Sequence, residues 1–326
     1  MKSQWKCSMN VTRRFLFISA ALFLGTSIAM SQPAQLNYRS FDLPGATLTA
    51  GFGINPQRNI VGLYKVGTVG HSYVLSKGTV TTIDPPYGIS GTSQAEGINP
   101  EGEIAGLYTD YGTVPGGDAF RTRGFLRDAS GNFTQIDFPG AENTFAIKVS
   151  STGQVVGCYH HQSSDFAVSG GGTMHGYVYQ NGSYQSLPVP GTMNNGITED
   201  GRIIVGVVYP TPTEFHAYKV EDGVYALLNL PANVVSSFPW TVNSSGEIVG
   251  YFVDSANETH GFLLNNADFT QIDFPGVNVV STQARDIDTE GDIVGFYLSK
   301  DSSGVLHEHG FVASRSQGRD SSIALP

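Results

Sequence analysis

Cysteine is scarce in this sequence of 326 residues, which holds only Cys7 and Cys158. Cys7 lies in an N-terminal segment that we expect to be cleaved off, so Cys158 is left alone and an intrachain disulfide is excluded. Cys158 stands within an apolar segment and is expected to be a small buried hydrophobic residue. Stability is therefore expected to come from packing, for which about 295 residues give an ample core.

Basic residues are also few, with 18 Lys and Arg against 28 Asp and Glu. Four of the 18 lie before residue 32, and without them 14 basic residues face 28 acidic ones, a formal net charge of −14. A surface this acidic repels phosphate groups and anionic lipid. Nucleic acid is therefore not expected as a partner, and neither is a membrane surface.

Long apolar runs occur only near the N-terminus, where residues 15–30 (FLFISAALFLGTSIAM) follow Lys2, Lys6, Arg13 and Arg14. A charged start, a short apolar stretch and small residues at Ala29 and Ser31 are the parts of a secretory signal peptide. We predict a signal peptide at 1–31, a single domain at 32–326 and a secreted protein, extracellular or periplasmic. No other run is long enough to span a bilayer, so no membrane insertion is expected.

Several motifs are missing as well. No stretch of ten or more residues has the period of an amphipathic helix. The sequence contains no G-x-S-x-G motif, no H-E-x-x-H motif and no glycine-rich phosphate loop. The sequence therefore contains no motif of a catalytic nucleophile and no motif of a nucleotide-binding site.

What the sequence does contain is a repeat. The segment FTQIDFPG occurs at 133–140 and again at 269–276, and it ends a longer unit that is present six times. Each unit has a segment like GINPEGEIAGLY (97–108), whose late glycine recurs at intervals of 44, 51, 49, 44 and 45 residues as Gly62, Gly106, Gly157, Gly206, Gly250 and Gly295. A second signature follows it, in the segments HSYV (71–74), RGFL (123–126), HGYV (175–178), HAYK (216–219), HGFL (260–263) and HGFV (309–312). A period of this length indicates a propeller, a solenoid or an array.

Each unit divides into four short strands bounded by Gly, Pro, Asn and Asp. The second strand is apolar on both faces, as a sheet packed between two neighbouring sheets requires. We therefore predict an all-β fold, a six-bladed β-propeller of four-stranded antiparallel blades. The alternatives are a β-solenoid and a seven-bladed propeller. The segment RSFDLPGA (39–46) has the fourth-strand signature ahead of the first complete unit, so we expect strand 38–44 to close the ring, with SSIALP (321–326) as the other candidate.

The pattern G-x-N-x-x-G-x-I-V-G followed by H-[AGS]-[FY] resembles the bacterial extracellular HAF-repeat proteins, named for His-Ala-Phe. The resemblance covers nearly the whole mature chain, although the middle residue here is mostly Gly. It implies export and a propeller-like repeat architecture. It implies no reaction and no catalytic residues.

In a propeller, the turns between first and second strands share one face, which we call the turn face. The loops between second and third strands share the opposite face, which we call the loop face. The turns are uniformly tight, whereas the loops lengthen at 109–122, 160–174 and 298–308, and long loops on a rigid scaffold often carry function. We predict a ligand-binding surface on the loop face that contains Asp110, Asp118, His160, His161, Asp165, His307 and Glu308.

The repeated histidines are interpreted as structural. His71, His175, His216, His260 and His309 occupy one repeat position in five units, and Arg123 occupies it in the remaining unit, the second. Equivalent positions are spread around a ring, too far apart to share one metal ion. We expect these side chains to hydrogen-bond backbone groups between blades.

One acidic string resembles part of a calcium loop. DIDTEGD (286–292) supplies Asp286, Asp288, Glu290 and Asp292 around a glycine, but the later bidentate Glu is missing. The favoured interpretation is a tight turn that happens to be acidic, with no cofactor. Calcium is the alternative, to be tested by calorimetric titration.

Two functions remain open from the sequence. The first is an exported, non-catalytic binding or scaffold protein, a monomer that recognises a glycan or another protein through the loop face. The second is a secreted hydrolase or lyase that uses His, Asp and Glu of the loops. The absence of a paired acid–base motif favours the first.

Overall fold

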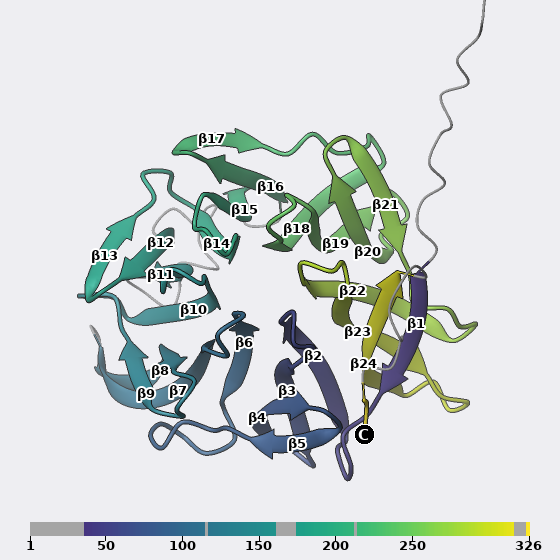
Figure 1. Ribbon diagram of the computed structural model, residues 1–326, viewed down its shortest axis with the longest axis horizontal. Helices are drawn as coiled ribbons and strands as arrows, with labels where there is room; N and C mark the ends of the chain where they lie inside the picture. The colour runs from purple at the N-terminus through teal and green to yellow at the C-terminus, as the bar shows by residue number, and fades with distance from the viewer. Residues whose placement is uncertain (1–35, 115–116, 161–173, 212–213, 316–323) are drawn as a thin grey trace, which may run out of the picture. The chain divides into compact units, whose positions relative to one another are not determined.

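The computed structural model describes residues 36–114, 117–160, 174–211, 214–315 and 324–326. Within these ranges every regular element is a β-strand. The strands form four-stranded antiparallel sets that stand in a ring around one axis (Figure 1), and we call the region along this axis the channel. The prediction of an all-β propeller is confirmed.

Blades 1 to 3 follow one another along the chain, each running from the channel outward. Blade 1 contains β2 (Leu48–Ile54), β3 (Ile60–Val66), β4 (Val69–Ser76) and β5 (Thr79–Thr82). Blade 2 contains β6 (Gln94–Ile98), β7 (Ile104–Val114), β8 (Gly117–Arg127) and β9 (Phe133–Ile136). Blade 3 contains β10 (Asn143–Val149), β11 (Val155–His160), β12 (His175–Gln180) and β13 (Ser183–Ser186).

The remaining strands repeat this order. Blade 4 contains β14 (Thr192–Ile197), β15 (Ile203–Thr211), β16 (Glu214–Glu221) and β17 (Val224–Leu227). Blade 5 contains β18 (Val234–Val242), β19 (Ile248–Asp254), β20 (Thr259–Asn265) and β21 (Asp268–Ile272). The last set contains β22 (Val279–Ile287), β23 (Ile293–Lys300), β24 (Leu306–Arg315) and β1 (Leu36–Phe41), and we call it blade 6.

The fourth strand of blade 6 comes from the other end of the domain. β1 pairs antiparallel with β24, with Leu36 opposite Arg315 and Phe41 opposite Gly310. The strand thus lies at 36–41, slightly before the expected 38–44. Blades 5 and 6 form one eight-stranded sheet, in which a single parallel pair, Thr259 with Ser281, joins two four-stranded sets. All of these strands belong to one compact unit, Ala34–Pro326.

The second strand of each blade is buried on both faces. In β3, Ile60 packs into a core cluster shared with blade 6, whereas the adjacent Val61 packs into a cluster shared with blade 2, and both are fully buried. Ile293 and Val294 of β23 divide in the same way. Full burial of each such side chain contributes about 1.5–3 kcal/mol. The core of this protein therefore lies between blades.

The repeated glycine of the second strand is required by a close approach. A Cβ atom on Gly206 would lie 2.1 Å from the carbonyl oxygen of Met193 and 2.5 Å from the hydroxyl of Tyr218. At Gly157 the corresponding carbonyl, that of Phe145, would be 1.7 Å away. The aromatic residue of the His-Gly-Phe signature thus packs over a position that has room for glycine only.

The tight turns between first and second strands each end on a residue of positive φ. In blade 2 the N–H of Gly102 donates to the carbonyl of Asn99 at 3.1 Å, and Gly102 has a φ of +85°. In blade 1 the same place is held by Arg58, which adopts a φ of +62° itself. A left-handed conformation costs a non-glycine residue roughly 1–2 kcal/mol. Blade 1 therefore has Arg in place of Gly at this turn position, but its backbone conformation there is the same.

Candidate ligand-binding site at the central channel

Each innermost strand carries a β-bulge at the same place in the repeat. The pairing with the second strand shifts just after Gly51, Ala95, Ala146, Asn194, Pro239 and Ala284. A bulge leaves one residue unpaired and redirects its side chain. The six residues at the bulges line one hollow in the channel, and all differ in type: Phe52, Glu96, Ile147, Asn195, Trp240 and Arg285. We call them the bulge ring.

Arg285 is the central member of this ring. Its guanidinium donates to Glu96 at 2.6 Å and lies 3.3 Å from the ring centroid of Trp240 and 4.3 Å from that of Phe52. Burial lowers the pKa of Arg285 and raises that of Glu96, because each charge loses solvation, while their mutual attraction opposes both shifts. The charge-assisted bond and the aromatic faces replace the lost water.

A second ion pair lies beside the first. The ammonium of Lys148 donates to Asp286, whose carboxylate also accepts the backbone N–H of Ile54 at 2.9 Å. This pair connects blades 3, 6 and 1 across the channel. The channel is therefore crossed by charged groups from opposite sides rather than filled by apolar side chains.

Several buried polar atoms around the bulge ring have no hydrogen-bond partner within the described part of the chain. They are Asn195 Oδ1, Trp240 Nε1, Thr241 Oγ1 and Arg285 Nε, and all belong to residues that line the same hollow. Three are donors or can act as donors, and one is an acceptor. An unsatisfied buried polar group costs about 1–3 kcal/mol. A polar ligand or solvent that reaches this hollow would meet groups ready to bond it.

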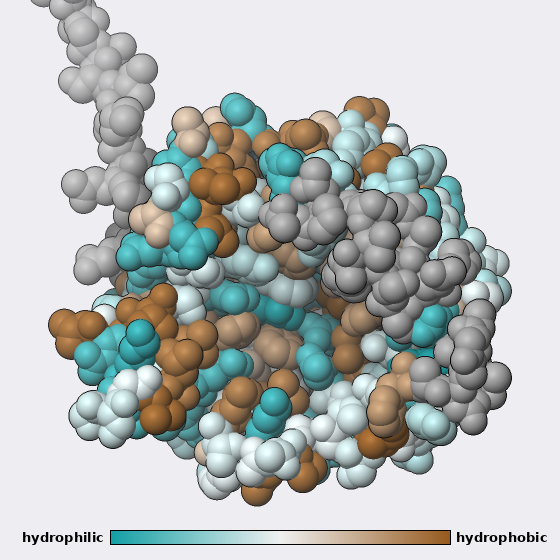
Figure 2. Space-filling view, turned by 180° about the vertical axis from the view of Figure 1, so that it is seen from behind, coloured by the Kyte–Doolittle hydropathy of each residue, from teal (hydrophilic) through white to brown (hydrophobic). Residues whose placement is uncertain are grey.

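Aromatic side chains continue from the bulge ring toward the loop face. The ring centroids of Trp240 and Phe238 are 4.6 Å apart. Those of Phe238 and Phe215 are 6.1 Å apart, and those of Phe215 and Tyr209 are 5.9 Å apart. Tyr251 stacks on Phe238 at 5.3 Å. We call these five residues the aromatic arc; four of them are partly exposed. Figure 2 shows the loop face, hollowed at its centre and bordered there by hydrophobic and hydrophilic residues.

Among the predicted loop residues that the structure describes, Glu308 has Arg285 in its electrostatic environment. Burial raises the pKa of Glu308, and the positive charges of Lys65 and Arg285 act against this shift. Phe296 in the neighbouring strand lies 6.2 Å from Phe52 of the bulge ring. The loop-face end of the channel thus combines aromatic rings with charges of both signs.

The other predicted loop residues do not gather at this place. His160 is buried in blade 3, 5.5 Å from the ring of Phe145 and 4.0 Å from Cys158 Sγ. His307 is exposed in blade 6, where Nε2 lies 3.2 Å from Asp301. Blades 3 and 6 stand on opposite sides of the ring (Figure 1). His161 and Asp165 lie outside the described residues, as does the side chain of Asp118.

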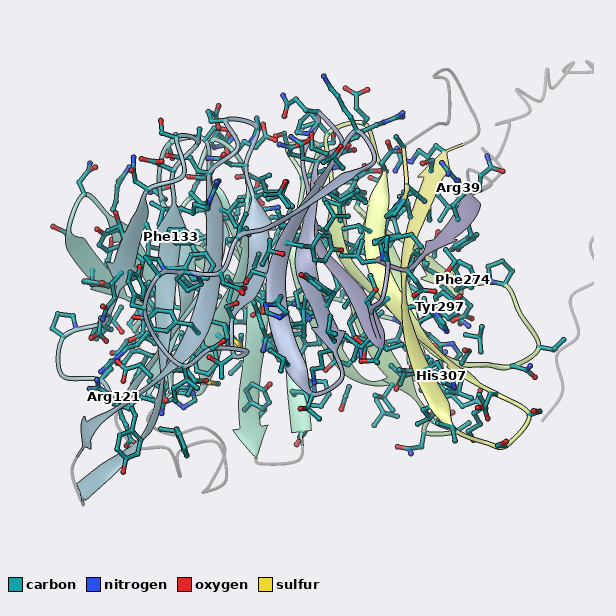
Figure 3. The ribbon with its side chains drawn as sticks, turned by 90° about the horizontal axis from the view of Figure 1, so that it is seen from below. Arg39, Arg121, Phe133, Phe274, Tyr297 and His307 are labelled. Carbon is teal, nitrogen blue, oxygen red and sulfur yellow. The ribbon has the colours of Figure 1, made fainter. Side chains whose placement is uncertain are left out.

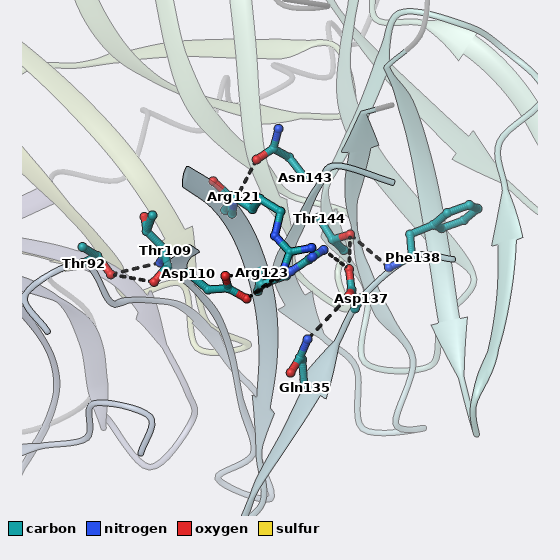
Figure 4. Close-up of polar contacts among 11 residues, drawn as sticks. Thr92, Thr109, Asp110, Arg121, Arg123, Gln135, Asp137, Phe138, Asn143 and Thr144 are labelled. Carbon is teal, nitrogen blue, oxygen red and sulfur yellow. Dashed lines mark hydrogen bonds and ion pairs between the residues drawn. The ribbon is translucent and has the colours of Figure 1, made fainter. Parts of the chain in front are cut away.

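Asp110 belongs to a separate polar cluster in blade 2. It accepts a hydrogen bond from Arg121 at 3.1 Å, and Arg123 Nε lies 3.6 Å away (Figure 4). Arg123 is almost fully buried and also pairs with Asp137. In the side view, Arg121 and His307 lie toward the same end of the blades (Figure 3). The described members of the predicted set therefore share the loop face but not one site.

The expectation that the repeated histidines bond backbone groups between blades is wrong for four of them, since Nε2 of His216 lies 2.8 Å from the carboxylate of Glu214 and three others contact an Asp. Nδ1 of His71, His260 and His309 lies 2.6, 2.9 and 2.9 Å from the carboxylates of Asp84, Asp273 and Asp42. Each carboxylate belongs to the Asp that ends the fourth strand beside the histidine of the third, in Asp-x-Pro-Gly at Asp42 and Asp273 and in Asp-Pro-Pro-Tyr at Asp84. In blade 6 that Asp comes from β1, so the pair also ties the two ends of the domain together.

The acidic string at 286–292 has separate partners for its members. Asp286 pairs with Lys148, Asp292 Oδ2 lies 3.0 Å from Arg58 Nε, and Asp288 Oδ1 accepts two N–H groups of its own turn, from Glu290 and Asp292. Only one cluster of three metal-ligating groups occurs among the described residues, and it includes none of these four. The calcium alternative thus gains no support from the geometry.

The turn face also has a hollow at its end of the channel. It is lined by residues of all six blades, among them the turn residues Asn55, Asn99 and Asn243. Asn55 donates to the carbonyl of Asn99 at 3.1 Å, and Asn99 donates to that of Ser150 at 3.1 Å. These bonds between successive blades give the Asn of the repeat signature a structural role.

The sequence reasoning did not identify the bulge ring. The repeat signature does not include these residues. They vary from unit to unit and stand one residue before the Gly, or its substitute, that begins the signature. A non-repeating residue at a fixed place in a repeat was the available signal.

Comparisons with known proteins show likeness of fold only. No protein-family model matches the chain, and no curated protein matches it. The putative TolB from Agrobacterium tumefaciens aligns with a TM-score of 0.51 at 14% identity, over 81% of this chain and 90% of that one. A putative gluconolactonase aligns with a TM-score of 0.50 at 11% identity, over 87% and 93%.

An acylaminoacyl peptidase from Pyrococcus horikoshii aligns with a TM-score of 0.51 at 12% identity, over 85% of this chain and 46% of that one. The chain likewise spans 56% of TolB from Acinetobacter baumannii, so it covers about half the length of these two proteins. No helix in the described ranges is long and apolar enough to cross a membrane. What the chain shares with solved structures is thus the propeller fold.

Proposed function

We propose that this protein is an exported, non-catalytic binding propeller that recognises another protein through its loop face. The observation that carries the proposal is the aromatic arc, which leads from the loop face to Arg285 in the channel. Aromatic residues and Arg are enriched at the energetic centres of protein interfaces. The arc places both on one surface.

A second aromatic feature lies on the same face. Tyr111 and Phe120 stand opposite each other near the end of the β7–β8 hairpin, with their rings edge to face at 5.4 Å and exposures of 61% and 66%. Large exposed apolar side chains beside each other mark interaction sites more often than single ones do. A partner that covers both the arc and this pair would have to be a macromolecule, and this favours a protein over a small glycan.

The hydrolase or lyase alternative gains no support from the described residues. His160, Asp110 and the pair His307 and Glu308 lie in three different blades. A proton donor and acceptor must both reach the reacting atoms to act together. Binding therefore remains the better-supported proposal.

The test uses exported host proteins captured on the immobilised mature chain. We expect a specific partner whose affinity falls about tenfold or more in a Tyr111→Ser/Phe120→Ser variant and in Tyr251→Ala, because each change removes about 1.4 kcal/mol or more of contact. Val224→Ser is the control, since Val224 is 69% exposed but follows a turn on the opposite face. Equal loss in the control, or binding to a glycan array instead, would refute the proposal of a protein partner.

Export and the HAF-repeat resemblance are part of the same proposal. They are supported by the charged and apolar segment at 1–30 and by the repeat signature. N-terminal sequencing of the protein recovered from outside the cytoplasm should begin at Gln32. Recovery of the protein from the cytoplasm with residues 1–31 still attached would refute the proposal of export.

A further inference from the structure

Blade 5 brings together three side chains that commonly bind metal ions. Asp254 ends β19, Glu258 lies in the hairpin turn, and His260 lies in β20. Nε2 of His260 is 3.9 Å from Asp254 Oδ2 and 3.9 Å from Glu258 Oε2, and the three ligand atoms all lie within 4.8 Å of one another. The group stands on the loop face, outside the aromatic arc and independent of the proposed partner site.

The imidazole is oriented from behind. Nδ1 of His260 lies 2.9 Å from Asp273 and 3.0 Å from Gln271 Nε2. Because a carboxylate can only accept, a neutral imidazole here carries its proton on Nδ1 and keeps a lone pair on Nε2. Gln271 donates to the other oxygen of Asp273 at 2.6 Å and fixes that carboxylate. A histidine held by a carboxylate through its second nitrogen is the usual arrangement around bound metal ions.

The charge at this place is unbalanced. Three carboxylates, those of Asp254, Glu258 and Asp273, face one imidazole, and no Lys or Arg nitrogen of the described chain lies within 4.0 Å of them. Like charges this close repel one another in the absence of a cation.

Blade 2 shows how the same repeat position is balanced elsewhere. Asp110 and Asp137 occupy the places of Asp254 and Asp273, and the residue between them is Arg123 instead of His260. Its guanidinium supplies within the chain the positive charge that blade 5 lacks. The comparison indicates that blade 5 takes its cation from solution.

We propose that Asp254, Glu258 and His260 bind a divalent transition-metal ion, with Asp273 as the positioning residue for the imidazole. One nitrogen and two carboxylate oxygens suit Zn²⁺, whereas Ca²⁺ prefers oxygen ligands alone. Tetrahedral bonds of about 2.0–2.1 Å place ligand atoms roughly 3.3 Å apart, so each of the two 3.9 Å distances from His260 Nε2 shortens by about half an ångström on binding. Glu258 is 69% exposed and lies in a turn, so this movement is small and unobstructed. Three protein ligands leave a fourth position for water.

The experiment is calorimetric titration of the tag-free full mature chain with Zn²⁺ and, separately, with Ca²⁺. We expect one Zn²⁺ per chain at this site. Glu258→Gln and His260→Asn should each weaken Zn²⁺ binding by about tenfold or more, and Asp273→Asn by about 10–100-fold. Because Glu258 is exposed, its variant remains informative even if His260→Asn is unstable.

His71→Asn is the matched control. His71 makes the same Nδ1 bond, to Asp84, but no acidic side chain other than Asp84 lies within 4.0 Å of it in the described chain. Unchanged Zn²⁺ binding in this variant, with loss in the blade 5 variants, supports the proposal. No saturable binding by the wild type, an equal loss in His71→Asn, or a preference for Ca²⁺ would overturn it.

Discussion

Asp288→Asn should make the protein more stable, and the gain should depend on pH. Asp288 is 4% exposed, and burial together with the neighbouring Asp292 raises its pKa from 3.8 to about 7. A carboxyl whose pKa is raised by folding contributes stability that is fully present below its unfolded pKa, near 4. That contribution is lost as the pH rises through the folded pKa, near 7.

The magnitude follows from the pKa difference. At about 1.4 kcal/mol per tenfold change, ionised Asp288 destabilises the fold by roughly 2–4 kcal/mol above about pH 8. Asn cannot ionise, and its Oδ1 can still accept the two turn N–H groups that Asp288 Oδ1 accepts at 2.9 Å. Asn55, Asn99 and Asn243 at the same repeat position each donate to the next blade. An Asn at 288 should add one such bond, to blade 1, worth about 1 kcal/mol.

The assay is thermal unfolding in EDTA at about pH 5 and about pH 8.5. At the higher pH the variant should melt several degrees above the wild type, since 1 kcal/mol shifts the midpoint by about 2–4 °C in a domain of this size class. At about pH 5, which lies between the unfolded and the folded pKa of Asp288, less than half of the ionisation gain should remain beside the small hydrogen-bond gain. A variant that is no more stable at high pH, or equally more stable at both, would refute the reasoning. Added Ca²⁺ that stabilises the wild type alone would instead revive the calcium alternative.

Three further predictions rest on packing and on buried charge. Gly206→Ala should lower the free energy of unfolding, measured in urea, by about 3 kcal/mol or more, because the added Cβ would lie 2.1 Å from a backbone carbonyl oxygen. Gly223→Ala is the control: its Cβ would have no atom within 4 Å, and the positive φ alone should cost about 1–2 kcal/mol. Glu96→Gln should cost about 3–5 kcal/mol because it leaves Arg285 buried without its counter-ion, and adding Arg285→Met should recover most of that loss in the same assay. Asp42→Ala should lower the thermal midpoint by loosening β1 from blade 6, and an unchanged midpoint would show that strand pairing alone closes the ring.

Much of the fold could be predicted because the features of the repeat depend on residues that are close together in the sequence. The tight turn needs a residue of positive φ two or three places after its first residue, and Gly102 supplies it within five residues of sequence. The two-faced burial of the second strand shows as unbroken apolar residues, as at Ile60 and Val61. Both signals concern neighbours in the chain, where sequence distance and spatial distance agree.

The candidate site could not be predicted in the same way. Arg285 and Glu96 are 189 residues apart and meet only because the ring brings blades 6 and 2 to one channel. Their side chains point inward because of a bulge in the innermost strands, and the sequence has no separate sign for it. The predicted loop residues His160 and His307 were grouped by chemistry, and the ring places them in opposite blades.

The sequence by itself determined the unit: four strands, their turns, and a core shared between consecutive units, since short-range patterns of Gly, Asn and apolar residues control these features. The tertiary structure decided which variable residues share a place. Closure of the ring brings one residue from each unit to the same hollow in the channel. Pairing within a hairpin places Asp254 and Glu258 beside His260. Charge balance between such groups depends on distances in space, and those distances exist only after the blades have closed.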